Sequence, residues 1–164
     1  MSAKAIIISS IIFIGLIVGM AFLFTSGQKP EVKAISYSQS DTDRPKAEVG
    51  NKFTDIGSMG VNDEKTADFS LKNTGTRPLQ ILDVTTSCHC TFGQIIYKGT
   101  ESQKFSMNGS GFVSEIAPGD TATVRITYIP SIMPVSGIIE REAYVKTNDP
   151  ENPRIIFSIQ ANVK

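Results

Sequence analysis

The residues best suited to chemistry in this chain are Cys88, His89 and Cys90, which follow one another directly. They include both cysteines and the single histidine of the 164 residues. In an extended segment the two cysteine side chains would point to the same face, with Cα atoms about 6.5 to 7 Å apart. A disulfide rarely spans more than about 6.8 Å between Cα atoms. A Cys88–Cys90 bond therefore needs a bent backbone, which a glycine between the cysteines would ease and His89 makes harder.

Three uses of this motif remain open from the residues alone. The two sulfurs can serve structure, as a disulfide or as small buried groups at the end of a strand. Two thiolates on one face can chelate Cu(I) or Zn(II), and His89 joins them only if the chain turns. Met59, Met107 and Met133 are further soft donors, whose positions the sequence leaves open. The third use is thiol redox chemistry, which needs a thiolate at neutral pH.

No other pattern in the sequence predicts catalysis. Any Ser–His arrangement would have to use His89, no Gly-rich phosphate loop follows an expected strand, and no His-Glu-x-x-His is present. The charge cluster Glu140-Arg141-Glu142 is typical of a solvated strand face. We therefore expect no enzymatic activity, no catalytic residue and no cofactor beyond the copper or zinc ion of the metal-binding alternative.

The elements that would position this motif begin with an apolar N-terminal segment. Residues 5–24 carry no charge, and thirteen of them are Ile, Leu, Val or Phe. As a helix, twenty residues span about 30 Å, the thickness of the hydrocarbon core of a bilayer. We predict a transmembrane helix within residues 1–25 that acts as an uncleaved signal anchor. A cleaved signal peptide is the alternative, because Thr25-Ser26-Gly27 is a weak cleavage site.

The distribution of charged residues predicts where the rest of the chain lies and argues against nucleic-acid binding. Lys4 is the only charged residue before Lys29, which favours a cytoplasmic N-terminus and an exported C-terminal part. That part carries 15 basic and 16 acidic residues, so it lacks the basic surface that nucleic-acid binding requires. Polar residues 26–48 predict a flexible linker. Residues 49–164 are enough for one soluble domain.

Residues 49–164 have the hydrophobic pattern of β-strands. The last run is the clearest, with one face formed by Ile155, Phe157, Ile159, Ala161 and Val163. Turn signals close each run; in Asn73-Thr74-Gly75, the asparagine and the glycine are expected to tolerate positive φ. No helical periodicity separates the runs, which predicts an all-β, Ig-like antiparallel sandwich of about seven strands. Residues 98–113 fit least well and indicate a long hairpin or an insertion.

Five segments, in order, carry a resemblance to a known family. They are Phe53–Gly57, Phe69–Ile81, Ser87–Thr91, Ile116–Asp120 and Thr147–Pro150. Over about residues 50–163 the chain resembles a bacterial Ig-like family of unknown function, related to the ASH/hydin and major-sperm-protein domains. The resemblance implies an Ig-like sandwich and no assigned activity. His89 replaces the usual glycine of the family's Ser-Cys-Gly-Cys-Thr pattern, and residues 98–113 add length.

These features together predict a single-pass membrane protein whose C-terminal domain is extracytoplasmic, in the periplasm or at the cell surface. We expect a non-enzymatic binding or scaffolding module for another membrane or extracytoplasmic protein, acting through a sheet edge or an apolar loop surface. The alternative is an extracytoplasmic copper- or zinc-binding protein that uses Cys88, His89 and Cys90.

Overall fold

The computed structural model describes residues 10–20 and 33–164. The chain divides into two units, Met1–Lys33 and Ala34–Lys164. In the first unit, residues 10–20 form a helix. Among the residues that the structure describes, no helix is both long enough and apolar enough to span a membrane. The rest of the predicted transmembrane segment, residues 1–9 and 21–25, lies outside the described residues, and the membrane anchor stays a prediction.

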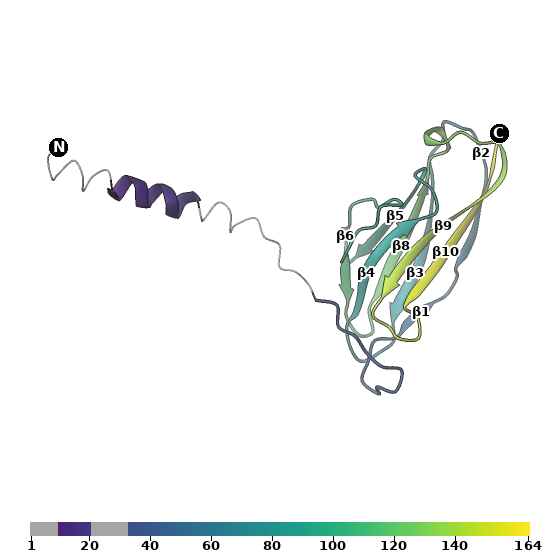
Figure 1. The fold of residues 1–164 in the computed structure, drawn as a ribbon. Coiled ribbons are helices and arrows are strands. Elements are labelled where there is room, and N and C mark those ends of the chain that lie inside the picture. Colours follow the sequence, from purple (N-terminus) through teal and green to yellow (C-terminus); the bar gives the residue numbers. More distant parts are fainter. Residues whose placement is uncertain (1–9, 21–32) are drawn as a thin grey trace. The chain divides into compact units, whose positions relative to one another are not determined.

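Residues 34–164 fold as a two-layer β-sandwich of ten strands (Figure 1). In spatial order, the first sheet contains β1 (Ala47–Val49), β3 (Lys65–Asn73), β8 (Thr121–Tyr128), β5 (Thr91–Tyr97) and β6 (Thr100–Glu101). The second contains β2 (Phe53–Met59), β10 (Arg154–Val163), β9 (Gly137–Thr147), β4 (Leu79–Thr86) and β7 (Ser114–Ile116). A short 3-10 turn, η1 (Pro130–Ile132), follows β8. The all-β sandwich is confirmed.

Two details of the predicted sandwich are corrected. About seven strands were expected, and the three that raise the number to ten, β1, β6 and β7, have only two or three residues each. Such strands are too short to show hydrophobic alternation. The sandwich is also not purely antiparallel, because β2 runs parallel to β10. This pair joins the two ends of the domain's sequence, so no local pattern indicates it.

The core lies between the two sheets and is built from alternate positions of the long strands. The predicted inner face of β10 is confirmed, because its five apolar side chains are at most 2% exposed. Phe69 of β3 meets Phe157 of β10 across the sandwich, with ring centroids 5.2 Å apart. Burial of these apolar groups is the main source of stability for the two layers.

Residues 98–113 close one side of the sandwich. β6 forms a hairpin with β5, and Phe105 exchanges two backbone hydrogen bonds of 2.8 Å with Gly93. Further along, Ser110 donates from its backbone to Asp83 at 2.6 Å, and its hydroxyl accepts from the backbone N–H of Val84 at 2.8 Å. The segment thus covers the outer edges of β5 and β4, which would otherwise be open to pairing with another chain.

The folded unit begins at Ala34, before the boundary that the sequence predicts at residue 49. Ile35 donates its backbone N–H to the side chain of Gln80 at 2.9 Å. Arg44 is only 6% exposed, and its guanidinium lies 3.3 Å from the carboxylate of Asp149. Residues 34–46 therefore pack against the sandwich, whereas residues 26–32 of the predicted linker lie outside the described residues.

Candidate functional site at the disulfide turn

The Cys88-His89-Cys90 motif lies in the tight turn that carries the chain from β4 in one sheet to β5 in the other. The backbone N–H of Thr91 donates to the carbonyl of Cys88 at 3.1 Å and closes the turn. The hydroxyl of Thr86 lies 3.0 and 2.8 Å from the carbonyl oxygens of Cys88 and Thr91. Ser87 exchanges two hydrogen bonds with the backbone of Glu142 in β9, at 3.0 and 2.9 Å. The turn is therefore anchored to both sheets.

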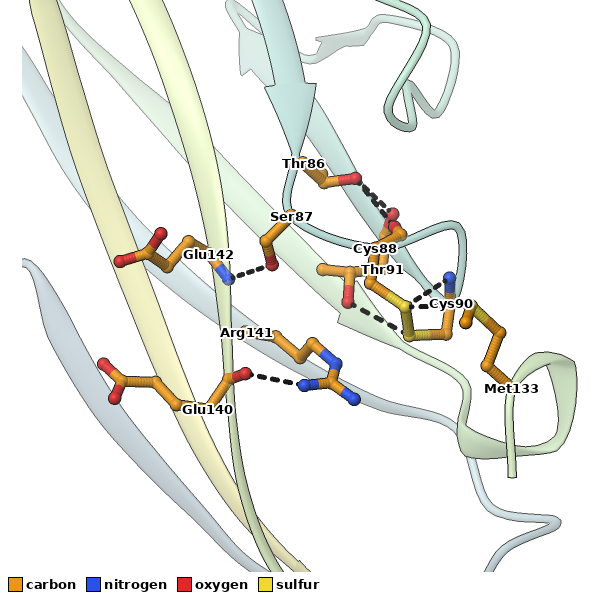
Figure 2. Close-up of a disulfide and its surroundings, with 9 residues drawn as sticks. All are labelled: Thr86, Ser87, Cys88, Cys90, Thr91, Met133, Glu140, Arg141 and Glu142. Atoms are coloured by element: carbon orange, nitrogen blue, oxygen red, sulfur yellow. Dashed lines mark hydrogen bonds between the residues drawn. A yellow bond between two sulfur atoms is a disulfide. The ribbon is translucent and has the colours of Figure 1, made fainter. Parts of the chain in front are cut away.

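A disulfide joins Cys88 and Cys90 within this turn (Figure 2). Their Cα atoms are 5.1 Å apart, inside the usual range for disulfides and shorter than an extended segment would give. The bent backbone that the sequence argument required is present, and the extended geometry is not. His89 lies between the two cysteines with its side chain exposed and does not have a positive φ. Both cysteines of the chain are thus paired.

The disulfide is packed into the end of the core. Cys90 is fully buried and Cys88 is 8% exposed, so only Cys88 reaches the surface. The backbone N–H of Cys90 donates to Cys88 Sγ at 3.1 Å, and Cys90 Sγ lies 3.9 Å from the hydroxyl of Thr91. Cys88 therefore keeps a small exposed surface, while Cys90 is enclosed by the turn.

Beside the disulfide is an open pocket of about 420 Å³, called here the sulfur pocket, lined by Ser87, Cys88, His89, Met107, Met133 and Arg141. Met133 Sδ lies 3.5 Å from Cys88 Sγ. Figure 2 shows Met133 reaching toward the cysteines from the segment after η1, and Arg141 extending toward them from β9. The pocket thus collects three sulfur-bearing side chains and an imidazole from segments far apart in the sequence.

Arg141 brings a positive charge to the sulfur pocket. Its guanidinium lies 5.6 Å from the ring centroid of Tyr128 and donates to the carbonyl of Glu140 at 2.8 Å. Its Nε is buried and has no hydrogen-bond partner within residues 10–20 and 33–164. Next to it, Glu142 accepts a hydrogen bond from the Tyr144 hydroxyl, which raises the pKa of that tyrosine. The Glu140–Glu142 cluster is therefore only partly the solvated face that the sequence indicated.

The structure shows which of the candidate metal ligands lie close together. It brings Cys88 and Cys90 together as a disulfide and leaves His89 on the pocket's surface. Of the three methionines, Met107 and Met133 line the pocket, whereas Met59 is buried in the core at the end of β2. No group of three or more His, Cys, Asp or Glu side chains in the described part of the chain could hold a metal. Metal binding needs both thiols reduced, and it stays a prediction.

Sequence reasoning missed Arg141 as part of this site. The residue belongs to β9, which reaches the pocket only because β9 pairs with β4 in the second sheet. That pairing is not visible from local alternation. The contact between Met133 and Cys88 is likewise set by the loop between β8 and β9, so the sequence could name Met133 as a soft donor without placing it.

Comparison with known proteins gives a family match over part of the chain and solved structures with a similar fold. The model of a family described as "Protein of unknown function (DUF1573)" matches residues 47–108, from β1 through the disulfide turn. The match covers less than half of the chain. A protein of unknown function from Porphyromonas gingivalis W83 has a TM-score of 0.58 and 20% identity, over 76% of this chain and 50% of that one. This chain thus spans about half the length of that relative.

Other solved structures are similar at lower scores. The ASH/PapD-like domain 7 of human CEP192 has 14% identity and a TM-score of 0.48, over 84% of this chain and 98% of that one. The CupB6 tip adhesin from Pseudomonas aeruginosa has 16% identity and a TM-score of 0.44, over 74% of this chain and 42% of that one. No curated protein matches the chain. At such identities, structural similarity bears on the fold alone, and the function has to be argued from the site.

Proposed function

We propose that this protein is a membrane-anchored, extracytoplasmic binding or scaffolding module without enzymatic activity, whose partner is another membrane or extracytoplasmic protein. The observation that carries the proposal is a set of exposed apolar side chains at one end of the sandwich. Here the β8–β9 segment and the start of β9 expose Ile132, Met133, Val135 and Ile138 by 36 to 72%. Met107, 46% exposed, lines the same pocket as Met133. These five residues are called the apolar loop surface.

An apolar loop surface on a rigid scaffold is typical of protein binding. Single exposed apolar residues are ordinary on a protein surface, whereas clusters mark interaction sites. Loops held by a sandwich often supply such contacts, because the sheets fix their positions. Ile138 is the most exposed large apolar residue of the sandwich, at 72%. Burial of this surface by a partner would remove that apolar area from water.

The edge of β2 is less suited to binding than this surface. Lys65 Nζ donates to the carbonyls of Ile56 and Ser58 in β2 at 2.7 and 3.0 Å. The side-chain amide of Asn51 donates from Nδ2 to the carbonyl of Phe53 and accepts at Oδ1 from the N–H of Phe53. These side chains occupy backbone groups that an added strand would need. We therefore favour the apolar loop surface over the edge of β2 as the docking route.

The membrane part of the proposal rests on the uncharged stretch of residues 5–24, which contains the helix of residues 10–20. An anchor would concentrate the sandwich near membrane partners without any new contact. Carbonate extraction of membranes should leave the full-length protein in the membrane fraction, and protease added outside the cytoplasmic membrane should digest the sandwich. Release by carbonate, or protection from the external protease, would contradict this part.

The partner-binding part is tested on the full-length protein in native membranes. Ile132→Ser combined with Ile138→Ser should abolish the partner cross-links that the unchanged protein forms, as identified by mass spectrometry. Ile156→Ser is the matched control, because Ile156 is 41% exposed on β10 and lies outside the apolar loop surface. Cross-links that survive the double substitution, or a wild type without any partner, would refute the proposal. Thermal unfolding of each variant checks that the fold is kept.

We also propose a second candidate function, extracytoplasmic binding of a soft metal, copper or zinc. The specific observation in its favour is that Cys88, His89, Met107 and Met133 line one pocket. Sulfur and imidazole are the ligands that such metals prefer.

A further inference from the structure

We propose that the sulfur pocket is a Cu(I) site that exists only when the Cys88–Cys90 disulfide is reduced, with Met133 and Met107 as thioether ligands. This inference rests on the soft-metal function above. It adds the ligand set, the oxidation state of the metal and control by the redox state of the two cysteines.

The ligand set follows from the positions of the sulfur atoms. The turn holds the two cysteine sulfurs together, and Met133 Sδ lies 3.5 Å from Cys88 Sγ. Met107 comes to the same pocket from the segment that closes the side of the sandwich. Cys90 does not line the pocket, but its sulfur is bonded to that of Cys88. After reduction, a cation placed here would therefore meet the Cys88 thiolate and two thioethers, with the Cys90 thiolate directly beside Cys88. Met133 and Met107 are about half exposed, so both side chains are free to adjust to a metal.

The chemistry of these ligands selects Cu(I) over Zn(II). Thiolate and thioether are soft ligands, and thioether in particular suits Cu(I). Zinc sites are built from thiolate, imidazole and carboxylate, four at a time where the role is structural. The described part of the chain offers no cluster of three such side chains. Among the described residues, His89 alone of these ligand types lies near the cysteines. A zinc ion would therefore have fewer than the four ligands of a structural zinc site.

The charges of the pocket fit the reduced copper form. Two thiolates and one Cu(I) carry a net charge of minus one, which a partly buried site has to compensate. Arg141 lines the pocket and brings one positive charge. Opposite charges attract more strongly near a protein surface than in bulk water. The guanidinium would therefore favour the thiolate-bound metal over an empty pair of neutral thiols.

The redox state of the Cys88–Cys90 disulfide would control metal binding. In the oxidised form both sulfurs are used in the S–S bond, and no thiolate is left for a metal. An external dithiol can reduce this bond: it gives two electrons and two protons, two cysteine thiols form, and the reductant becomes a disulfide. Cys88 is the sulfur attacked first, because Cys90 is fully buried. Cu(I) then displaces the two thiol protons and keeps its oxidation state.

The turn is built to keep the two sulfurs close after reduction. The hydrogen bonds of Thr86 to the turn carbonyls and of Ser87 to Glu142 do not involve the S–S bond. They hold the backbone of Cys88 and Cys90 in the bend in either redox state. Little ordering is then left for the metal to impose, which favours binding.

The test uses the full-length protein in detergent, reduced with a phosphine under anaerobic conditions and titrated with Cu(I) against a chromogenic Cu(I) chelator. The reduced protein should bind one equivalent, and the oxidised protein should bind at least about 100-fold more weakly. Met133→Leu and Met107→Leu should each weaken binding by about tenfold or more, since even residues that only support a metal ligand contribute about 10- to 100-fold. Met59→Leu is the matched control and should change nothing, because that methionine is 3% exposed in the core.

The results distinguish a failure of this inference from a failure of the soft-metal function. If the reduced protein binds neither Cu(I) nor Zn(II) in parallel titrations, both the copper site and the soft-metal function are wrong, whereas binding of Zn(II) without Cu(I) refutes this inference alone. If it binds with full affinity in both Met→Leu variants, or equally well when oxidised, this inference is wrong and the soft-metal function stands. X-ray absorption of the copper-loaded protein provides an independent reading, since sulfur must dominate its first coordination sphere.

Discussion

At the scale of single residues, Asn73 joins four parts of the sandwich. Its side chain is fully buried, and its Oδ1 accepts from the backbone N–H groups of Lys46 and Gly75 at 3.3 and 3.0 Å. Its Nδ2 donates to the carbonyls of Arg77 and Ile116 at 2.8 and 3.0 Å. All hydrogen-bonding positions of the amide are thus used. The sequence indicated a residue chosen for positive φ, whereas Asn73 does not have one.

Asn73→Ala is therefore expected to destabilise the fold. The substitution leaves buried backbone groups without partners, at a cost of about 1–3 kcal/mol. Urea denaturation measures the change in the free energy of unfolding. Thr74→Ala is the control, because Thr74 is exposed and its change should stay within about 0.5 kcal/mol. Equal stability of the two variants would contradict the role given to the amide.

Position 75 requires a glycine because a side chain would not fit there, and not because of the φ angle. A Cβ at this position would overlap the backbone of Arg44, Pro45 and Lys46. Gly75→Ala should therefore cost about 1–3 kcal/mol in the free energy of unfolding, the usual range for overpacking. Gly50 is the matched control, since a Cβ there meets nothing within 4 Å. Gly50→Ala should be neutral or slightly stabilising, and a similar loss in both variants would argue against the close approach.

Asp120 gives the fold a specific dependence on pH. Its carboxylate accepts a hydrogen bond from the Tyr97 hydroxyl at 2.6 Å and lies 3.0 Å from Lys98 Nζ. The bond from Tyr97, and then that from Lys98, lowers the pKa of Asp120 below its ordinary value of 3.8. A carboxyl group whose pKa falls on folding stabilises the protein fully above its unfolded pKa, and this stabilisation is lost as pH falls through the folded pKa.

Asp120→Asn should accordingly reduce the free energy of unfolding near neutral pH, and the difference from the wild type should shrink below about pH 4. Urea denaturation at a series of pH values gives this difference directly. Tyr97→Phe removes the largest cause of the lowered pKa and should show part of the same pH dependence. A difference between wild type and Asp120→Asn that stays constant into acid would refute the assignment.

At the scale of elements, β2 shows how the sandwich protects an edge strand. Lys65 lies at the start of β3, yet its ammonium group caps two carbonyls of β2. Lys65→Gln should leave stability within about 1 kcal/mol, because the contact is near the surface. It should increase self-association measured by analytical ultracentrifugation, since exposed edge carbonyls invite pairing between molecules. Lys72→Gln on the same strand is the control, and equal association in both variants would disprove the capping role.

The elements also show what the sequence could and could not predict. A long strand that buries one face, such as β10, was predicted because alternation with period two indicates burial directly. The β2–β10 pairing and the short strands were not, because they depend on contacts between distant segments. The same division holds at the site. The cysteines could be named from the sequence, whereas their bend, Arg141 and the Met133 contact come from the packing of β4, β9 and the loop after β8.

At the scale of the whole sandwich unit, residues 34–46 act as a strap held by Asp149. This aspartate is 1% exposed and accepts hydrogen bonds from Arg44, from the backbone of Ala47 and Glu151, and from Asn152, at 2.8 to 3.3 Å. A buried carboxylate needs such compensation, and Arg44 supplies its opposite charge. In Figure 1 the strap crosses the end of the sandwich opposite to η1. The strap and the sandwich therefore stabilise each other.

Two truncated chains separate a strap from a flexible linker. A chain starting at Ala34 keeps Arg44 and should unfold at the same urea concentration as the full-length protein in the same detergent. A chain starting at Lys46 keeps all of β1 but loses Arg44. It leaves the Asp149 charge buried without its partner, which should cost about 3–5 kcal/mol. Arg44→Met in the full-length protein should lose a similar amount, because it removes the charge and keeps most of the side-chain volume. If the chain starting at Lys46 were as stable as the one starting at Ala34, residues 34–46 would be the flexible tether that their composition suggests, and Asp149 would have to be neutral or hydrated in the folded protein.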